Sequence, residues 1–289
     1  MPPSPRVLLS IDYEPWFALT RRHDRLLGIE QRRNLDGGFT LNALEPILEL
    51  LGNARCSIYL VGEVAEWYPQ IPQKITTIGH ELGFHCHTHR SLVKPEELKR
   101  DLAASAIWLK QYNVRGYRAP MVGIDEKAYA MLASNGFTYS SSTYAPAGTL
   151  LKKNNLTPSS CTVWELPVST FPIFGRKKEQ VINAPRNFSP GLLASGEIPY
   201  GSSFMIGLMP KMILRILERE LRAGLSPVIF LHPYEIIRPE AFGSRMRRDL
   251  VANPLLLPFI IHKQEFLTTL IKNFPISPLN TYLEEAQHA

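Results

Sequence analysis

The chain has 289 residues, of which 45% are hydrophobic and 20% are charged. This balance is typical of a soluble globular protein and excludes an intrinsically disordered chain. Lys and Arg number 32 against 26 Asp and Glu, and the formal net charge of +6 suits an anionic partner without requiring nucleic acid.

Cysteine content and apolar runs indicate the compartment. Cys56, Cys86 and Cys161 are odd in number and widely spaced, so no disulfide framework is expected. Residues 1–6 are too few and too rich in proline for a signal peptide. The longest uncharged apolar run, about 198–210, contains Gly, Ser and Pro and is too short to span a bilayer. We therefore expect a cytoplasmic protein.

The first part of the chain alternates short apolar runs with helical patterns. Residues 7–11 are Val, Leu or Ile except for Ser10, and such a run is typical of a buried strand. Residues 41–51 carry apolar side chains at three- and four-residue spacing and end at Gly52, which predicts a helix. The next predicted elements are a strand at 56–61, short helical segments at 64–67 and 72–79, and a strand at 81–85.

The alternation continues to the end of the chain. Pro95 and two acids open a helix with an apolar stripe up to Leu109. Further helices are predicted at 126–134, 211–223 and 266–272, and further strands at 116–120, 137–142 and 227–231. Strands that are apolar throughout and alternate with helices predict a parallel sheet covered by helices. We therefore expect one α/β domain over residues 1–289, a barrel with its chemistry at the strand ends.

Two acids follow the first predicted strand. Asp12 and Glu14 are two residues apart, so on an extended chain they share a face and point into one cavity. Two carboxylates held together favour one ionised metal ligand and one group with a shifted pKa. A turn with two solvated acids would give the same pattern, and the strand end alone does not separate these interpretations.

Histidines cluster after the strand at 81–85. His85, His87 and His89 fall within five residues, although the whole chain has 8 histidines. His85 and His89 are four residues apart, so one helical turn would place both imidazoles on one side, as in helical zinc-binding pairs. We interpret these two as metal ligands and His87 as a packing residue. A structural role for the pair, or ligation by Cys86, is the alternative.

Two other strand ends carry a charged or titratable side chain. Arg118 lies in the strand at 116–120 and is expected to hold a carboxylate such as Asp12. His232 follows the buried strand at 227–231 and is expected to act as a general acid. Structural arginines and histidines are common at such positions, so neither residue identifies a site alone.

In this order, the segments resemble the polysaccharide deacetylases, the NodB-homology proteins of carbohydrate esterase family 4. The resemblance extends over about residues 7–283 and rests on five motifs in the family's order. They lie at residues 10–14, 79–89, 116–120, 165–170 and 226–235. The acid–any residue–acid pattern of the first motif resembles the branch of lipopolysaccharide and O-antigen deacetylases.

The resemblance implies a single-domain distorted (β/α) barrel and a metal-dependent removal of acyl groups, usually acetyl, from an N-acetylated sugar. It implies a divalent metal, with Zn²⁺ as the first choice, held by Glu14, His85 and His89. Asp12 would be the general base, although which of Asp12 and Glu14 is base and which is ligand stays open. The other implied roles are Arg118 orienting Asp12, His232 protonating the leaving amine, and substrate contacts by Tyr13, Trp16, Pro120 and Glu165.

The sequence departs from the family pattern at two positions. Cys86 stands where the family often has Ser or Thr after the first metal histidine. Ser140 follows Tyr139 where related sequences often carry an aspartate that orients the catalytic histidine. The partner of the catalytic histidine is therefore either missing or replaced, with Glu235 and Glu165 as the candidate replacements.

Three functions agree with these observations. The first is deacetylation of a bacterial surface polysaccharide or of its lipid-linked precursor. The second is hydrolysis of a small cyclic amide or ureide on the same scaffold, and the third is non-catalytic carbohydrate binding. Basic segments at 21–25, 32–33 and 245–248 suit phosphate groups or an anionic membrane surface, and equally a solvated face. Residues 205–217 are expected to pack in the core rather than against lipid. No nucleic-acid-binding motif is present, and the oligomeric state is not determined.

Overall fold

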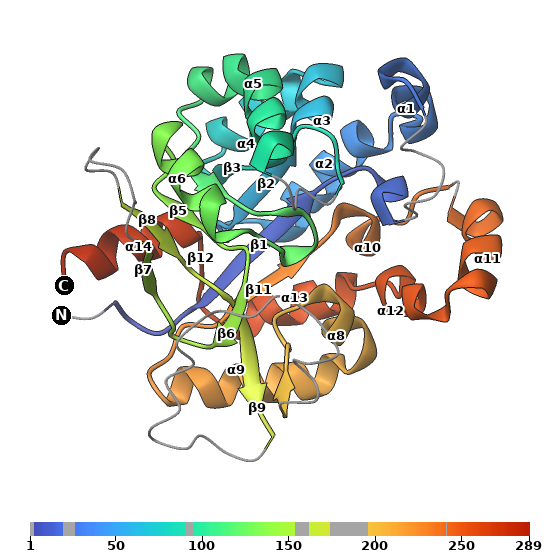
Figure 1. The fold of residues 1–289 in the computed structure, drawn as a ribbon. Coiled ribbons are helices and arrows are strands. Elements are labelled where there is room, and N and C mark those ends of the chain that lie inside the picture. The colour runs from blue at the N-terminus through green and yellow to red at the C-terminus, as the bar shows by residue number, and fades with distance from the viewer. Residues whose placement is uncertain (1–2, 20–26, 91–94, 154–161, 174–195, 241) are drawn as a thin grey trace.

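A nine-stranded sheet organises the protein. The computed structural model describes residues 3–19, 27–90, 95–153, 162–173, 196–240 and 242–289, with the backbone alone at 243–245 and 247–248. The strand order is β11 (Val228–Leu231), β1 (Val7–Tyr13), β2 (Ser57–Val61), β3 (Glu81–Cys86), β4 (Gly116–Tyr117), β5 (Tyr139–Ser140), β8 (Val163–Glu165) and β7 (Leu151–Lys153), and β12 (Ile276–Ser277) pairs with the start of β1. All of these pairs are parallel except β7 with β8. The carboxyl ends of the parallel strands therefore meet at one edge (Figure 1).

A smaller sheet bends back toward β11. It contains β6 (Tyr144–Pro146), β9 (Val168–Pro172) and β10 (Glu197–Ile198), with β9 in the middle. The backbone N–H of Val228 donates to Ser169 Oγ at 2.8 Å, and that of Phe230 donates to the Gly201 carbonyl at 3.0 Å. These bonds hold β9 and the residues after β10 beside β11. The result is an incomplete, distorted barrel.

Helices surround the barrel (Figure 1). In the first half of the chain they are α1 (Ile29–Asp36), α2 (Phe39–Leu51), α3 (Gly62–Trp67), α4 (Gln70–Thr77), α5 (Pro95–Gln111) and α6 (Glu126–Ser134). In the second half they are α8 (Ser203–Leu208), α9 (Pro210–Arg222), α10 (Pro233–Ile236), α11 (Phe242–Ala252), α12 (Leu257–Ile260), α13 (Gln264–Asn273) and α14 (Leu279–Gln287). Short 3₁₀ turns occur at η1 (Trp16–Leu19), η3 (Pro120–Val122) and η4 (Pro254–Leu256).

The alternation of side chains along β1 explains how the barrel is filled. Leu9, Ile11 and Tyr13 belong to the large apolar core shared with the helices. Ser10 and Asp12 have the opposite parity and face the barrel interior, since successive side chains point to opposite sides of a strand. Both faces of β1 are buried. This is why the strand lacks the apolar–polar alternation of a half-exposed strand.

The predicted elements agree with this architecture, and the predicted barrel fold is confirmed. Two predicted strands are shorter than expected. Regular pairing in 116–120 is confined to Gly116–Tyr117, because Pro120 begins η3, and in 137–142 to Tyr139–Ser140, because the chain turns toward β6 directly afterwards. The sequence predicted no element at α1, α8, α10, α11, α12, α14, β7, β8, β12 or the small sheet. Those strands are only two to five residues long, too short for a periodicity to be recognised.

Candidate active site

Four strand ends deliver the candidate site at the carboxyl edge of the sheet. Asp12 lies on β1 and Glu14 directly follows it, His85 lies on β3, and Arg118 and His232 follow β4 and β11. Their side chains are buried; Asp12 and Glu14 are each 2% exposed and Arg118 is 0% exposed. The sequence motifs predicted that these side chains lie at strand ends.

Glu14, His85 and His89 form a cluster of metal-binding geometry. Glu14 Oε2 lies 3.4 Å from His85 Nε2 and 2.8 Å from His89 Nε2, and one donor atom from each residue lies within 4.8 Å of the others. Two ligands of a tetrahedral zinc ion at about 2 Å are about 3.3 Å apart. The three donor atoms therefore need only small movements to share one ion. The predicted helical turn between the two histidines is wrong, because bends after β3 bring the rings together instead.

The hydrogen bond on the far side of His85 favours a cation between these groups. His85 Nδ1 lies 2.8 Å from the carbonyl oxygen of Arg118. A carbonyl accepts only, so Nδ1 carries the proton, and in neutral His85 the Nε2 lone pair faces the Glu14 carboxylate. Two acceptors at this distance repel unless a proton or metal ion lies between them. Carbonyl-anchored imidazole is also the usual environment of a metal-binding histidine, so the donor set fits a divalent ion.

The charge on Glu14 is stabilised by its neighbours. Burial would raise the pKa of Glu14, but the imidazoles of His89 and His232 and the close contact of the His85 ring hold that pKa well below its usual value. Tyr234 donates its hydroxyl proton to Glu14 Oε1 at 2.9 Å. Glu14 is therefore an ionised carboxylate, as a metal ligand has to be.

Asp12 is held from one side by Arg118. Arg118 Nη1 lies 3.4 Å from Asp12 Oδ2, and Nη2 donates to Ser10 Oγ and Ser141 Oγ. The guanidinium lies between the rings of Tyr59 and Phe230, 5.1 Å from each centroid. Asp12 Oδ1 is buried and has no hydrogen-bond partner among the described residues. One carboxylate oxygen is thus fixed and the other is left free to accept a proton.

His232 is oriented by Glu235. His232 Nδ1 lies 3.1 Å from Glu235 Oε1, and the Ser203 hydroxyl contacts both side chains. Burial would lower the pKa of His232, but the carboxylates of Glu235 and Glu14 outweigh it, so that pKa is raised above 6.5. The Nε2 atom points toward Glu14, 3.7 Å from Oε1. The candidate replacements for the aspartate were Glu235 and Glu165. Glu235 contacts His232, whereas Glu165 accepts hydrogen bonds from Ser142 and Thr143. Ser140, at the position of the aspartate, donates to Ser142.

Several site residues were missed in the sequence. Lys263 is 2% exposed and donates to Glu235 Oε1 at 2.9 Å. Tyr234 stacks on His232 with an interplanar angle of 8° and a centroid distance of 5.0 Å. Tyr234 follows His232 by two residues in the last motif, so its position in the sequence could have identified it as a site residue. Lys263 and Ser203 lie about 30 residues away from the motif on other elements, and no local pattern marks them.

The predicted substrate contacts do not agree with the structure. Tyr13 has the opposite parity to Asp12, lies in the core and donates to the Thr40 carbonyl. Trp16 is 2% exposed and packs on Phe17 and Phe242. Pro120 is buried at the start of η3.

Glu165 differs from its predicted role in the same way. Its side chain is 0% exposed and accepts hydrogen bonds from Tyr129, the backbone of Ser142 and Thr143. These bonds support the loop beside Arg118. None of the four predicted side chains is therefore available to a substrate in this structure.

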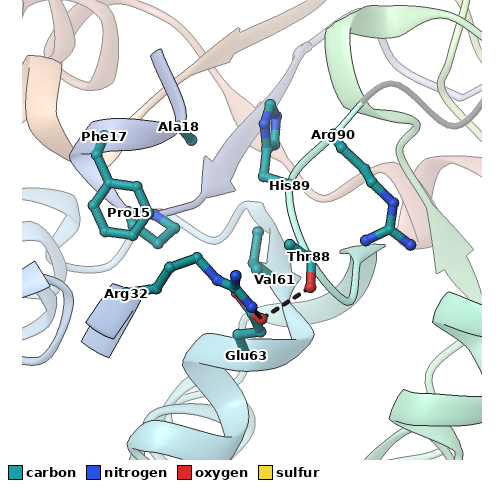
Figure 2. Close-up of a pocket in the computed structure, with 9 residues that line it drawn as sticks. All are labelled: Pro15, Phe17, Ala18, Arg32, Val61, Glu63, Thr88, His89 and Arg90. Atoms are coloured by element: carbon teal, nitrogen blue, oxygen red, sulfur yellow. Dashed lines mark hydrogen bonds and ion pairs between the residues drawn. The ribbon is translucent and has the colours of Figure 1, made fainter. Parts of the chain in front are cut away.

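A cavity of about 240 Å³ adjoins His89 (Figure 2). One wall is apolar, with Pro15, Phe17 and Ala18, and the other is polar. On the polar side Arg32 forms an ion pair with Glu63, which also accepts a hydrogen bond from Thr88. The neighbours of Trp16, rather than Trp16 itself, thus form the concave surface next to the metal-binding cluster.

Cys56 and Cys86 are free and buried, and burial raises the pKa of both thiols. Cys161 and the basic segment 21–25 lie outside the described residues. Within the described ranges, no helix combines the length and apolar character needed to cross a membrane.

No family model and no curated protein matches the chain, but solved structures do. An assigned polysaccharide deacetylase from Mycobacterium smegmatis aligns over 96% of both chains, with 17% identity and a TM-score of 0.53. Another, from Pseudomonas aeruginosa PAO1, aligns over 98% of this chain and 90% of its own, with 12% identity and a TM-score of 0.60. The PuuE allantoinase gives the same coverage and TM-score at 14% identity. The chain therefore has the fold of the polysaccharide deacetylases, a fold that the allantoinase shares.

Proposed function

We propose that this protein is a metal-dependent amidohydrolase that removes an acetyl or other acyl group from the nitrogen of a sugar. The observation that carries the proposal is the position of Asp12 and His232 beside the cluster of Glu14, His85 and His89. The free carboxylate oxygen can act as a general base, the imidazole with the raised pKa as a general acid, and a metal ion at the site as a Lewis acid, and together these groups allow hydrolysis of an unactivated amide.

Each residue has a distinct role in the proposed reaction. A divalent ion bound by Glu14, His85 and His89, with Zn²⁺ as the first choice for two imidazoles and one carboxylate, would polarise the acyl carbonyl and lower the pKa of a water molecule. Asp12 accepts the proton of the attacking water at Oδ1, while Arg118 holds its other oxygen. His232 donates a proton to the leaving nitrogen, and Glu235 keeps its ring in position.

For the substrate, we propose an N-acetylated saccharide of a bacterial surface polysaccharide or of its lipid-linked precursor. The apolar wall and the polar wall of the cavity beside His89 suit a sugar ring, which has an apolar face and hydroxyl groups. The acid–any residue–acid pattern of the first motif supports the lipopolysaccharide branch, and the free buried thiols support a cytoplasmic location. No role in nucleic-acid binding is proposed.

A cyclic amide or ureide hydrolase is the second candidate, because the PuuE allantoinase shares the fold. The two candidates differ in the leaving nitrogen and in the size of the substrate, so a comparison of substrates separates them. The third candidate, a binding protein without catalysis, predicts a bound metal and no turnover.

The test combines metal analysis with acetate release. Purified protein is assayed on N-acetylated sugars and on allantoin, with and without a chelator. We expect acetate release from the sugars that stops with chelator and returns with Zn²⁺. His85→Ala should lose the metal, whereas Asp12→Asn should retain it and lose turnover by about 10²–10⁴-fold. His288→Ala, at an exposed histidine far along the chain, is the matched control and should behave as wild type.

Stoichiometric metal with no acyl release from any amide would contradict the proposal and favour carbohydrate binding. Release from allantoin alone would favour the second candidate. Full turnover in His85→Ala would exclude the metal-dependent mechanism itself.

A further inference from the structure

Exposed apolar side chains gather on one side of the protein. Ten large apolar side chains are exposed in the described part of the chain. Six of them lie on α8, η4, α12 and the helix ends next to them: Leu208, Met209, Val251, Leu255, Leu257 and Ile261. Single exposed apolar residues are normal, whereas a cluster marks an interaction surface. We call these six residues the α8–α12 surface.

The two segments of this surface are in direct contact. Helix α8 packs against α12, and α11 and α12 both pack against η4. At Gly207 the backbones approach so closely that an added Cβ would lie 2.1 Å from the Pro258 carbonyl oxygen. Leu208 and Leu257 are the chain neighbours of these two residues. The elements that carry the six residues therefore pack on one another, and α11 and α12 lie at the right of Figure 1.

The charges around the α8–α12 surface are positive. Residues 206–215 and 250–263 contain no acid. Lys211 and Arg215 are exposed and, four residues apart on α9, share one face of that helix. Asp249 and Glu265 lie just outside the second of these segments, 250–263.

The surface is continuous with the candidate active site. The ring of Phe259, on α12, lies 6.1 Å from that of His232 and 5.5 Å from that of Phe204 on α8. Lys263, which binds Glu235, also donates to the Pro258 carbonyl at 2.9 Å. The element that carries Leu257 therefore also forms the wall of the site next to His232.

We propose that the α8–α12 surface docks on an anionic lipid bilayer. Aliphatic side chains with a basic border are the composition of elements that lie in a membrane interface, where they enter the acyl region while the cations contact lipid headgroups. Symmetric docking on a second copy would bring the basic border of one copy toward the basic border of the other, which is unfavourable. Docking would place the His232 side of the site at the membrane. This placement would bring a lipid-linked glycan to the site for deacetylation, an inference that rests on the proposed function.

The test is flotation of the purified full-length chain with phosphatidylcholine vesicles, with and without phosphatidylglycerol. We expect binding that requires phosphatidylglycerol and weakens in high salt. Leu255→Ser/Leu257→Ser should lower the partition coefficient by about a hundredfold, because each of the two leucines that leaves water contributes roughly tenfold. Lys211→Gln/Arg215→Gln should lower it by roughly thirtyfold. Ile107→Ser, at a residue 84% exposed on α5, should have no effect.

The absence of vesicle binding by the wild-type chain would overturn the proposal, as would unchanged binding of Leu255→Ser/Leu257→Ser. Light scattering gives the molar mass in solution and so tests for docking on a second copy. A wild-type dimer that is a monomer in Leu255→Ser/Leu257→Ser would assign the surface to self-association and overturn lipid docking. Acetate release from a water-soluble N-acetylated sugar should be equal in Leu255→Ser/Leu257→Ser and in the wild type. Vesicle binding without any acyl release would retain the docking surface and refute the proposed function alone.

Discussion

The Oε1 atom of Glu235 lies 3.1 Å from Nδ1 of His232, three residues earlier in the chain. The same turn lets Glu235 Oε2 accept the backbone N–H of His232 at 2.9 Å. One carboxylate thus fixes both the ring and the backbone of the proposed general acid. The acid that orients this histidine therefore lies on the histidine's own helical turn.

This contact sets the pH dependence of the proposed reaction. Burial lowers the pKa of His232, but the carboxylates of Glu235 and Glu14 together outweigh burial, so this pKa is raised above its ordinary value. A raised folded-state pKa stabilises the protein below the unfolded value, and this stabilisation is lost as the pH rises through the folded value. We expect kcat/KM to fall on the alkaline side with an apparent pKa above 6.5. Glu235→Gln should move this limb to lower pH and reduce kcat by about 10²-fold or more, and an unmoved limb would contradict the assignment.

Lys263 should act through the same carboxylate. Its ammonium group is buried, and burial lowers its pKa while Glu235 opposes this change. Lys263→Met leaves the Glu235 charge without its main partner, which should cost about 3–5 kcal/mol of stability. The check is a double-mutant cycle in kcat: Lys263→Met should slow wild type and have little further effect on His232→Ala. Equal losses in both backgrounds would show that Lys263 acts on the fold alone.

Metal binding should stabilise the folded chain. Glu14, His85 and His89 come together only after folding, so Zn²⁺ at 100 times its dissociation constant should add about 2.7 kcal/mol to the free energy of unfolding. Glu14→Gln should abolish most of this gain in thermal or denaturant unfolding. His87→Gln is the control, since His87 contacts Ser105 and Asp101 of α5 instead. An equal gain in Glu14→Gln would place the metal elsewhere.

A glycine inside the barrel is needed for the position of Arg118. A Cβ added to Gly83 would lie 2.3 Å from Cδ1 of Tyr59, whose ring packs on the Arg118 guanidinium. Gly83→Ala should therefore cost about 1–3 kcal/mol of stability and reduce turnover as Arg118 shifts. Gly123→Ala meets no atom within 4 Å and should change stability by less than about 0.5 kcal/mol. Equal stability of the two variants, measured by denaturant unfolding, would refute this packing argument.

The sequence by itself predicted the barrel and the metal-binding cluster. Unbroken apolar runs identified the parallel strands, and polar residues directly after those runs identified the chemistry, because the carboxyl ends of parallel strands meet at one edge. Asp12, Glu14, His85 and His232 are all local features of this kind. The parity of β1 would also have excluded Tyr13, since a residue between two inward acids points outward.

Only the tertiary structure decided what surrounds these groups. Lys263 and Ser203 reach Glu235 from elements that are distant along the chain, and Phe259 reaches His232 from α12. The burial of Glu165 and Trp16, which removes them as substrate contacts, depends on packing against several elements at once. Local spacing fixes the direction in which a strand-end side chain points, but contacts between distant segments follow from how the helices close around the barrel.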